Sequence, residues 1–395
     1  MAEHDPKKHI ESLRDHLASP GSATCFLFGA GTSCSIRVPP SGNSLIPAIG
    51  PLTEHCKNQV AALGKDASAA WQSIEDLCKS NGKQANIENI LSNIRIRLDA
   101  IGESESSLSL PRKRLKEMEE TICRAIAKIV NPDLTTLPSD SPHFKFAKWI
   151  KLAKRSSAIE LFTTNYDVLF ELCLESSGVP VFDGFIGCHT PFFLPECLED
   201  ESLLPSVRWV RLWKVHGSVT WKNHTLFSRQ VLTRCSPTDT GEMILPSQRK
   251  YDESRKLPYT ALMDRLTKVL FRERSLLLIS GYSFGDEHIN SVIFSALEAR
   301  PSSHVIALQF PNLKPNDTIV KIAEKLKNFT VYGRDAAVIS GQYGQWKLTN
   351  PIDPKVADFM TCGFKTDPKA PSALTGEFLL GDFADFGKFL ETLEY

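Results

Sequence analysis

The sequence lacks several features that would assign it to a specialised class of protein. No two of its ten cysteines have the C-x-x-C spacing of a zinc ribbon, so we expect no structural zinc. No apolar run approaches the roughly 18 residues of a membrane span, and the opening MAEHDPKKHIESLRDHL has no apolar signal core. Internal repeats and low-complexity tracts are also absent. We therefore expect a cytoplasmic globular protein with reduced thiols and no membrane contact.

The sequence also has no net charge, because 46 lysines and arginines balance 46 aspartates and glutamates. No overall electrostatic field attracts nucleic acid, so direct binding of nucleic acid is not indicated. The 395 residues, 42% of them hydrophobic, suffice for a sizeable core. They predict one large domain with an insertion, or two domains.

Strand-like apolar runs alternate with helix-like stretches over most of the chain. This pattern predicts an α/β fold with a Rossmann-like, doubly wound parallel sheet. Residues 182–206 have no sustained period and are interpreted as a long loop. The expected strands cover residues 24–28, 158–164, 207–215, 275–281, 304–310 and 329–333.

A long helical segment interrupts this alternation. From residue 53 to 139, apolar residues recur at intervals of three and four, which predicts an all-helical insertion. The Rossmann-like core would then comprise residues 21–52 and 140–345. An N-terminal helix at 1–20 precedes it, and a C-terminal tail at 346–395, with a short helix, is a possible oligomer contact.

A glycine turn follows the first strand. Gly29, Ala30 and Gly31 let the backbone turn tightly against an anionic ligand, and Thr32 and Ser33 supply hydroxyls at the start of a helix. The N–H groups and positive dipole end of such a helix attract a pyrophosphate. Because the third glycine of the usual dinucleotide fingerprint is missing, a simple tight turn is an equally good interpretation of this motif alone.

Three further polar clusters follow predicted strands. TTNYD (163–167) follows IELF, HGS (216–218) follows LWKV, and GYSFGD (281–286) follows LLLIS. In an open parallel sheet, ligands bind beyond the carboxyl ends of the strands. One crevice could therefore contain these clusters and the glycine turn.

Each polar residue also has a purely structural interpretation. Asn165 could cap the following helix, and His216 could be a strand-end turn residue. Asp167 could simply complement the dipole of a first helical turn. Asp286 is equally compatible with an N-cap.

Taken together, the motifs resemble one family. GAGTS, TTNYD, KVHGSVTW, ILPSQRK and ISGYSFGDEHI occur in the order and approximate spacing of the Sir2-like superfamily, over roughly residues 20–340. NIENILS at 86–92 is similar to its bacterial defence-associated, NAD-degrading branch. The resemblance implies that NAD+ is the substrate and that no zinc is needed.

The resemblance assigns roles to residues. It implies that Asn165 is the ribose-side, water-positioning amide and that His216 is the general base. Cleavage of the nicotinamide–ribose bond develops positive charge on the sugar, so oriented polar groups and a proton acceptor suit it. The other expected NAD-binding residues are Gly29, Ala30, Gly31, Ser33, Thr164, Asp167, Gly281, Ser283 and Asp286.

Two departures from the family pattern bear on the activity. Protein-deacylating sirtuins usually carry a zinc ribbon and a proline-aspartate-phenylalanine-arginine stretch after the first glycine turn; residues 36–42 here read IRVPPSG. The resemblance therefore favours hydrolysis of NAD+ to nicotinamide and ADP-ribose. The alternatives are an NAD-dependent deacylase or ADP-ribosyltransferase, and a nucleotide-binding scaffold or sensor without turnover.

The resemblance also implies a setting and partners. Members of this branch deplete NAD+ in anti-phage, abortive-infection defence. Those with little beyond the Sir2-like domain assemble into homo-oligomers and pair with a HerA-like translocase ATPase. We expect the same of this chain.

Overall fold

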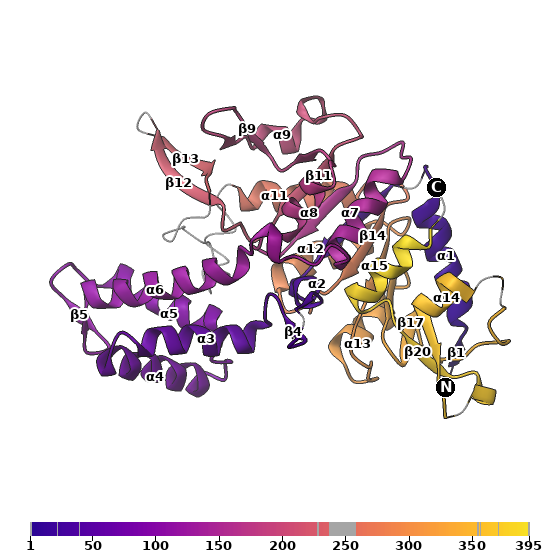
Figure 1. The fold of residues 1–395 in the computed structure, drawn as a ribbon, viewed down its shortest axis with the longest axis horizontal. Helices are drawn as coiled ribbons and strands as arrows, with labels where there is room; N and C mark the ends of the chain where they lie inside the picture. The colour runs from indigo at the N-terminus through magenta and orange to yellow at the C-terminus, as the bar shows by residue number, and fades with distance from the viewer. Residues whose placement is uncertain are drawn as a thin grey trace.

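The computed structural model describes residues 2–393 apart from 22, 39, 227–228, 237–257, 354, 356 and 370. A sheet flanked by helices forms the body of the molecule, and a helical arm projects from it (Figure 1). The motif ILPSQRK (244–250) lies outside the described residues. None of the described helices combines the length and apolar character needed to cross a membrane.

The main sheet has ten strands in the order β1-β18-β17-β16-β15-β14-β2-β7-β11-β8. Its strands are β1 (Ala2–His4), β2 (Thr24–Phe28), β7 (Glu160–Thr163), β8 (Val181–Phe182), β11 (Val210–Lys214), β14 (Leu276–Ser280), β15 (His304–Leu308), β16 (Phe329–Tyr332), β17 (Ala336–Ile339) and β18 (Gln342–Trp346).

The parallel centre of this sheet has Rossmann topology. Its six strands, numbered 1 to 6 in chain order, are β2, β7, β11, β14, β15 and β16. Their order across the sheet is 3-2-1-4-5-6, which is that of doubly wound dinucleotide-binding folds. The α/β prediction is thus confirmed. The sheet is mixed rather than wholly parallel, because Ser340 and Gly341, both with positive φ, turn β17 back into β18 as an antiparallel hairpin.

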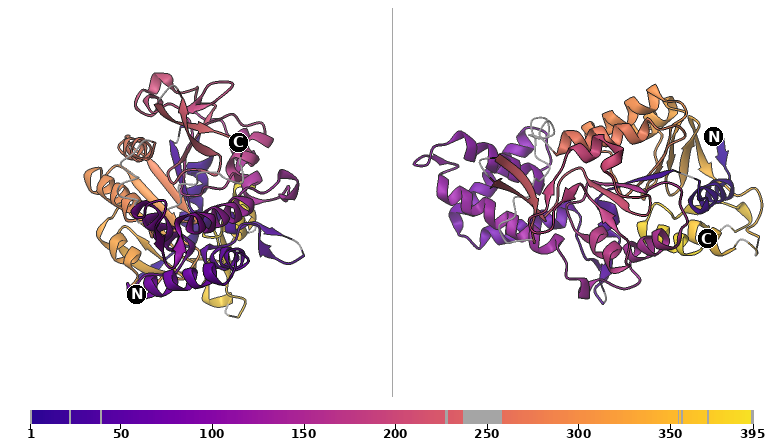
Figure 2. Two further views of the ribbon diagram at one scale, coloured as in Figure 1. Left: turned by 90° about the vertical axis from the view of Figure 1, so that its left-hand side faces the viewer. Right: turned by 90° about the horizontal axis from the view of Figure 1, so that it is seen from above.

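Helices cover both faces of the sheet (Figure 2). Alternate residues of β2 separate the two cores: Phe26 and Phe28 enter one, Cys25 and Leu27 the other. The first core contains apolar residues of α1 (Pro6–Ala18), α7 (Pro142–Leu152), α8 (Leu169–Ser176), α14 (Ala357–Gly363) and α15 (Phe383–Glu391). The second contains those of α11 (Tyr259–Leu270), α12 (Glu287–Ala299) and α13 (Thr318–Lys325).

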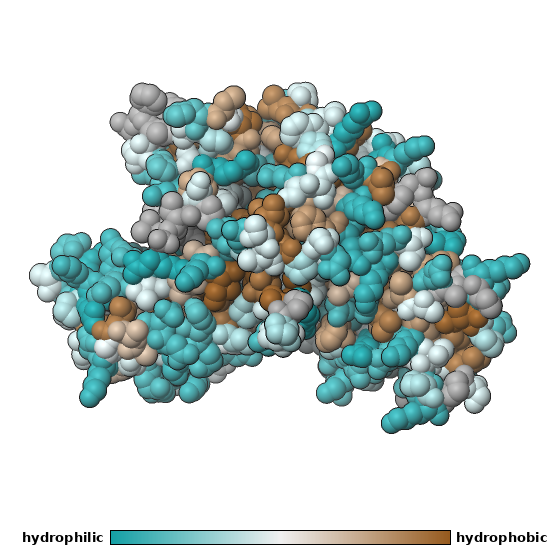
Figure 3. Space-filling view, in the orientation of Figure 1, coloured by the Kyte–Doolittle hydropathy of each residue, from teal (hydrophilic) through white to brown (hydrophobic). Residues whose placement is uncertain are grey.

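The predicted helical segment forms the projecting arm. Its helices are α3 (Ile49–Ala61), α4 (Lys65–Ser80), α5 (Ile87–Ala100) and α6 (Arg112–Val130), followed by the short η1 (Leu134–Thr136). Trp71, Ile94 and Met118 are buried between them, while the outer face of the arm is largely hydrophilic (Figure 3). This division is the amphipathic pattern that the sequence showed.

The interpretation of residues 182–206 as a long loop is wrong. The segment contains β9 (Phe185–Ile186), β10 (Phe192–Phe193), α9 (Glu196–Glu199) and η2 (Glu201–Leu203). Its strands join β12 (Trp221–Leu226) and β13 (Arg229–Arg234) in a second, four-stranded sheet. Two-residue strands have no readable period, and their sheet is completed by the distant pairing of Phe192 with Thr233, so local pattern could not reveal them.

One predicted strand is also shorter than expected. Residues 207–215 give the strand Val210–Lys214, because the chain before it turns, with Trp209 N donating to Ser206 O at 3.0 Å. Smaller elements complete the fold. They are the short helices α2 (Ala30–Cys34) and η4 (Pro371–Ala373), and the paired strands β3 (Arg37–Val38) with β4 (Asn43–Ser44), β5 (Ser106–Ser107) with β6 (Leu110–Pro111), and β19 (Phe364–Thr366) with β20 (Gly376–Phe378).

The C-terminal tail is part of the core. Helix α15 packs against α7, and Phe383, Phe386 and Phe389 of α15 are buried. The ring of Phe383 lies 5.1 Å from that of Phe28 at the end of β2. This face of α15 is therefore occupied within the chain and is not open to another subunit.

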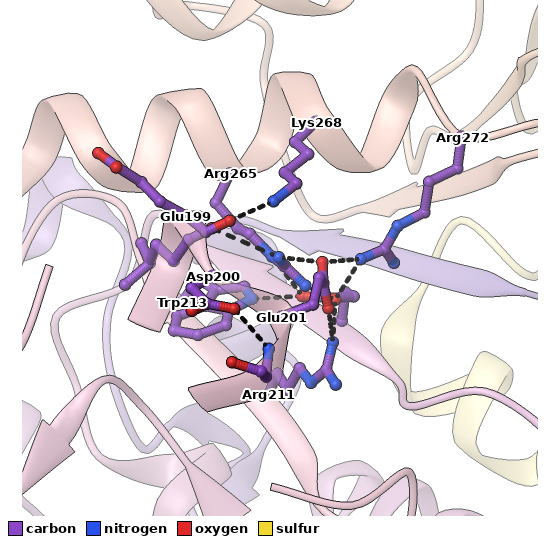
Figure 4. A network of polar contacts seen from close by, with 11 residues as sticks. Glu199, Asp200, Glu201, Arg211, Trp213, Arg265, Lys268 and Arg272 are labelled. Carbon is purple, nitrogen blue, oxygen red and sulfur yellow. Dashed lines mark hydrogen bonds and ion pairs between the residues drawn. The ribbon is translucent and has the colours of Figure 1, made fainter. Parts of the chain in front are cut away.

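A buried ion network supports the amino-terminal end of the sheet (Figure 4). Glu160, fully buried, accepts hydrogen bonds from Arg211 at 3.0 Å, Arg272 at 3.2 Å and Trp213 at 2.6 Å, and also from Arg265. Burial opposes ionisation of Glu160, but the hydrogen bonds and charge of Arg265 outweigh it and lower the pKa of the carboxyl group. This end of the sheet is thus fixed by charge pairing rather than by apolar packing alone.

Candidate active site

The glycine turn lies where the strand order of the sheet reverses, between β2 and β14. Gly31 N donates to Gly281 O at 2.9 Å, and Gly29 N donates to Ser280 O at 3.1 Å. A Cβ at Gly29 would lie 2.5 Å from Gly281 O, and one at Gly281, where φ is +67°, would lie 2.5 Å from Thr32 N. The two turns therefore touch backbone to backbone, which only glycine permits. Dinucleotides bind at this switch point in folds of this topology.

The residues of the turn divide into an exposed and a buried set. Ala30 and Gly31 are exposed, whereas Thr32 and Ser33 are buried at 0% and 2% exposure. The Ser33 hydroxyl donates to Asp167 Oδ2 at 2.6 Å. Ser33 therefore points into the protein. Its hydroxyl, which was expected to face a phosphate, instead holds the turn by its bond to Asp167.

Asn165 fixes the turn from the neighbouring strand. Its Nδ2 lies 3.1 Å from Gly29 O, 3.1 Å from Thr32 Oγ1 and 2.9 Å from Ser33 Oγ. A carbonyl oxygen can only accept, so the contact with Gly29 O assigns the NH2 group to this side and Oδ1 to the other. The sequence reasoning placed the Thr32 hydroxyl at the start of the helix but did not select Thr32 among the NAD-binding residues.

Asp167 has a structural role, an alternative that the sequence left open. Besides Ser33, its carboxylate accepts from Leu169 N at 3.1 Å, just as α8 begins. Its backbone oxygen accepts from the buried Lys214, whose Nζ also lies 2.7 Å from Glu171 Oε1. Burial raises the pKa of Asp167, and the charge of Lys214 opposes this. Lys214, which the sequence reasoning did not select, thus joins β11 to the TTNYD segment.

His216 is paired with Asp286. Its Nε2 lies 2.9 Å from Asp286 Oδ2, and its side chain is 16% exposed. Gly217, with φ of +85°, turns the chain directly after it. With Asp286 ionised, the proton resides on Nε2, so the lone pair of Nδ1 can accept another. This is the arrangement of a base held by an orienting carboxylate.

Asp286 is also the N-cap of α12, as the sequence allowed. Its Oδ1 accepts from His288 N at 2.9 Å and Ile289 N at 3.4 Å at the start of α12. One carboxylate thus caps a helix with one oxygen and orients His216 with the other. The N-cap interpretation of Asp286 agrees with these contacts, and its contact with NAD+ stays a prediction.

Hydrogen bonds connect the predicted clusters at one edge of the sheet. Asn165 binds the glycine turn, Val215 N donates to Thr163 O at 2.9 Å, His216 contacts Asp286, and Gly281 contacts Gly31. The loops after β2, β7, β11 and β14 therefore form a continuous ring of contacts. The sequence expectation that these clusters share one location agrees with this geometry.

Two predicted site residues contribute less to this ring. Thr164 is half-buried, and its backbone N donates to Phe28 O at 3.0 Å. Ser283 is exposed at the loop after β14. Their contacts with NAD+ stay predictions.

A comparison with protein families identifies the domain. Residues 159–331 match the model of the SIR2-like domain. The chain contains a SIR2-like domain. The match begins beside β7 and ends in β16, so it includes Asn165, His216 and Asp286 but not the glycine turn. No curated protein matches the chain.

SIR2-like domains bind NAD+. Within the described part of the chain, no group of three or more histidine, cysteine, aspartate or glutamate side chains could hold a metal ion. The described residues of the site supply hydrogen bonds, an orienting carboxylate and an imidazole.

Proposed function

We propose that this protein is an NAD+ hydrolase that cleaves the nicotinamide–ribose bond and releases nicotinamide and ADP-ribose. The observation that carries the proposal is the His216–Asp286 pair, 2.9 Å apart, beside the glycine turn of a SIR2-like domain. A histidine held this way is prepared to accept a proton.

The proposed reaction uses Asn165 and His216, from the ring of contacts described above, in turn. The bond between ribose C1′ and the pyridinium nitrogen breaks, and nicotinamide leaves as a neutral molecule with the electron pair. Positive charge develops on the ribose, where Oδ1 of Asn165 supplies the negative end of a fixed dipole. Water then bonds to C1′, and its proton passes to Nδ1 of His216.

Two alternatives make different demands on this site. A deacylase or ADP-ribosyltransferase needs an acceptor other than water, and it would release nicotinamide only when that acceptor is present. A nucleotide-binding scaffold needs the glycine turn but no proton acceptor. His216 is oriented by the carboxylate of Asp286, which favours an enzyme with turnover over a nucleotide-binding scaffold.

The test is to incubate the purified chain with NAD+ and follow nicotinamide and ADP-ribose by chromatography. His216→Ala should abolish release, and His224→Ala, at an exposed position on β12, should not. Thermal unfolding of each variant separates lost chemistry from lost fold. Release by the His216→Ala variant would exclude His216 as the base, and release only with an added acyl-peptide would identify a deacylase.

We also propose the biological setting that the resemblance implies, namely NAD+ depletion in the cytoplasm during anti-phage defence. An unrestrained NAD+ hydrolase would harm its own cell, so assembly into a homo-oligomer and pairing with a HerA-like ATPase are proposed as its control. Light scattering should then give a particle much larger than the 44.0 kDa chain. A strict monomer at micromolar concentration, unaffected by the ATPase, would contradict this assembly.

A further inference from the structure

A cavity lies at the opposite end of the sheet from the glycine turn. It has a volume of about 600 Å³ and is enclosed by the end of α7, the turn after α8 and the residues that precede β11. Val210 lines it at the start of β11, six residues before His216. At about 3.3 Å per strand residue, the two sites are about 20 Å apart. The cavity is therefore separate from the candidate active site.

Cations surround this cavity. Lys151, Lys154, Arg155 and Arg208 line it, and none of the described residues that line it carries a carboxylate. The C-termini of α7 and α8 each contribute roughly half a negative charge. Lys151, Lys154 and Arg208 alone exceed this negative charge, so the cavity favours an anion with more than one charge.

Its mouth is also apolar. Trp209, Val207 and Leu152 are 39%, 45% and 51% exposed, although each has a large apolar side chain. The buried Ile159 and Val179 line the interior. An exposed indole next to cations offers a flat surface on which a base can stack. Simple anions such as inorganic phosphate would leave this surface unused.

Parts of the cavity are already fixed in the structure. The guanidinium of Arg155 lies 4.2 Å from the centre of the Trp149 ring. A Cβ at Gly178 would lie 3.7 Å from Nζ of Lys151, so this lysine reaches across the turn after α8. Cavities of this size, apolar with a few placed charges, are typical of sites for small ligands.

We infer that this cavity binds a phosphorylated nucleotide, with the phosphates at the cations and the base against Trp209. The inference goes beyond the proposed NAD+ hydrolysis and does not depend on it, because the cavity shares no residue with the ring of contacts around Asn165 and His216. Its ligand would be a second nucleotide, bound while the active site is empty or occupied.

Isothermal titration of the full chain with ATP tests this inference. The variant carrying both Lys154→Glu and Arg208→Glu should bind ATP at this site at least about ten-fold more weakly. Trp209→Ala should weaken ATP by about five-fold or more, in keeping with the contribution of one stacked base. The variant carrying both Lys113→Glu and Lys116→Glu, at exposed positions of the helical arm, makes the same change of charge far away and should leave the affinity unchanged.

Inorganic tripolyphosphate separates the base from the phosphates. It should compete with ATP, and its affinity should fall with the charge reversal but not with Trp209→Ala. ATP bound at the glycine turn would be unaffected by any of these substitutions, because they lie at the other end of the strands. Unchanged ATP affinity in the charge-reversed protein, or no ATP binding at millimolar concentration, would overturn the inference.

Discussion

Asp286 divides its two carboxylate oxygens between His216 Nε2, at 2.9 Å, and the backbone N–H groups that begin α12. A substitution can therefore remove one function and keep the other. Asparagine caps a helix about as well as aspartate. Its amide NH2, however, would face Nε2 as a donor and force the imidazole proton onto Nδ1.

We accordingly expect Asp286→Asn to fold with nearly native stability and to lower kcat for NAD+ cleavage by roughly 10²- to 10⁴-fold, the range for a base held in the wrong tautomer. Asp286→Ala should lose both activity and about 1 kcal/mol of stability, because the cap is lost as well. Nicotinamide release and urea unfolding measure the two effects. Full activity in Asp286→Asn would show that this carboxylate does not orient the base.

A second prediction concerns Asn165 as a support of the glycine turn. In Asn165→Asp, an oxygen would replace Nδ2 and face Gly29 O at 3.1 Å, so two acceptors would repel each other. We expect this variant to lose about 1–3 kcal/mol of unfolding free energy, and more than Asn165→Ala does. Denaturant unfolding of both variants checks the order. If Asn165 served only as a ligand group, both proteins would keep wild-type stability in the absence of NAD+.

A third prediction concerns the buried His143 of α7. Its ring lies 4.7 Å from that of Phe170 and 5.1 Å from that of Phe383, and neither ring nitrogen has a hydrogen-bond partner among the described residues. Burial lowers the pKa of His143 to about 3. The unfolded chain, with a pKa near 6.5, takes up this proton first.

His143 should therefore make the free energy of unfolding fall as pH drops below about 6.5, by about 1.4 kcal/mol per pH unit down towards pH 3. Replacing the ring by an apolar one of similar size, His143→Phe, should remove this slope and stabilise the protein at pH 5. His9, whose pKa burial lowers to about 4, adds a slope of the same sign that the variant keeps. Unfolding curves at several pH values measure it; an unchanged slope would mean that His143 is protonated in the folded protein.

The fourth prediction concerns Glu160 in the network of Figure 4. Glu160→Gln keeps the shape but leaves Arg211, Arg265 and Arg272 facing a neutral group, at an expected cost of about 3 kcal/mol or more. Glu201 contacts the same arginines, but its side chain is 46% exposed. Glu201→Gln is the matched control and should cost less than about 1 kcal/mol. Equal losses in the two variants would contradict the importance of burial.

The sequence predicted the parallel strands and the ends that carry polar residues because these features are local. A buried run such as LLLIS and a polar cluster after it can be read without knowing what they touch. The sheet order 3-2-1-4-5-6 then places those ends together, and the family resemblance supplied the roles of Asn165 and His216.

What the sequence could not predict depends on contacts across the fold. Nothing in the sequence near Ser33 indicates that its partner is Asp167, which lies 134 positions away. Lys214 reads as an ordinary strand residue, and only the structure shows it bound to the backbone of the TTNYD segment. The short strands β9 and β10 were missed for a related reason, since two residues show no period and β10 is also held by its pairing with the distant β13.

The packing of Phe383 on Phe28 has a consequence for how the protein is made. The helix that covers the end of β2 is synthesised long after this strand, which carries the glycine turn. A nascent chain without α15 leaves this face of the strand open to water. The site should therefore become complete only once synthesis has passed residue 391.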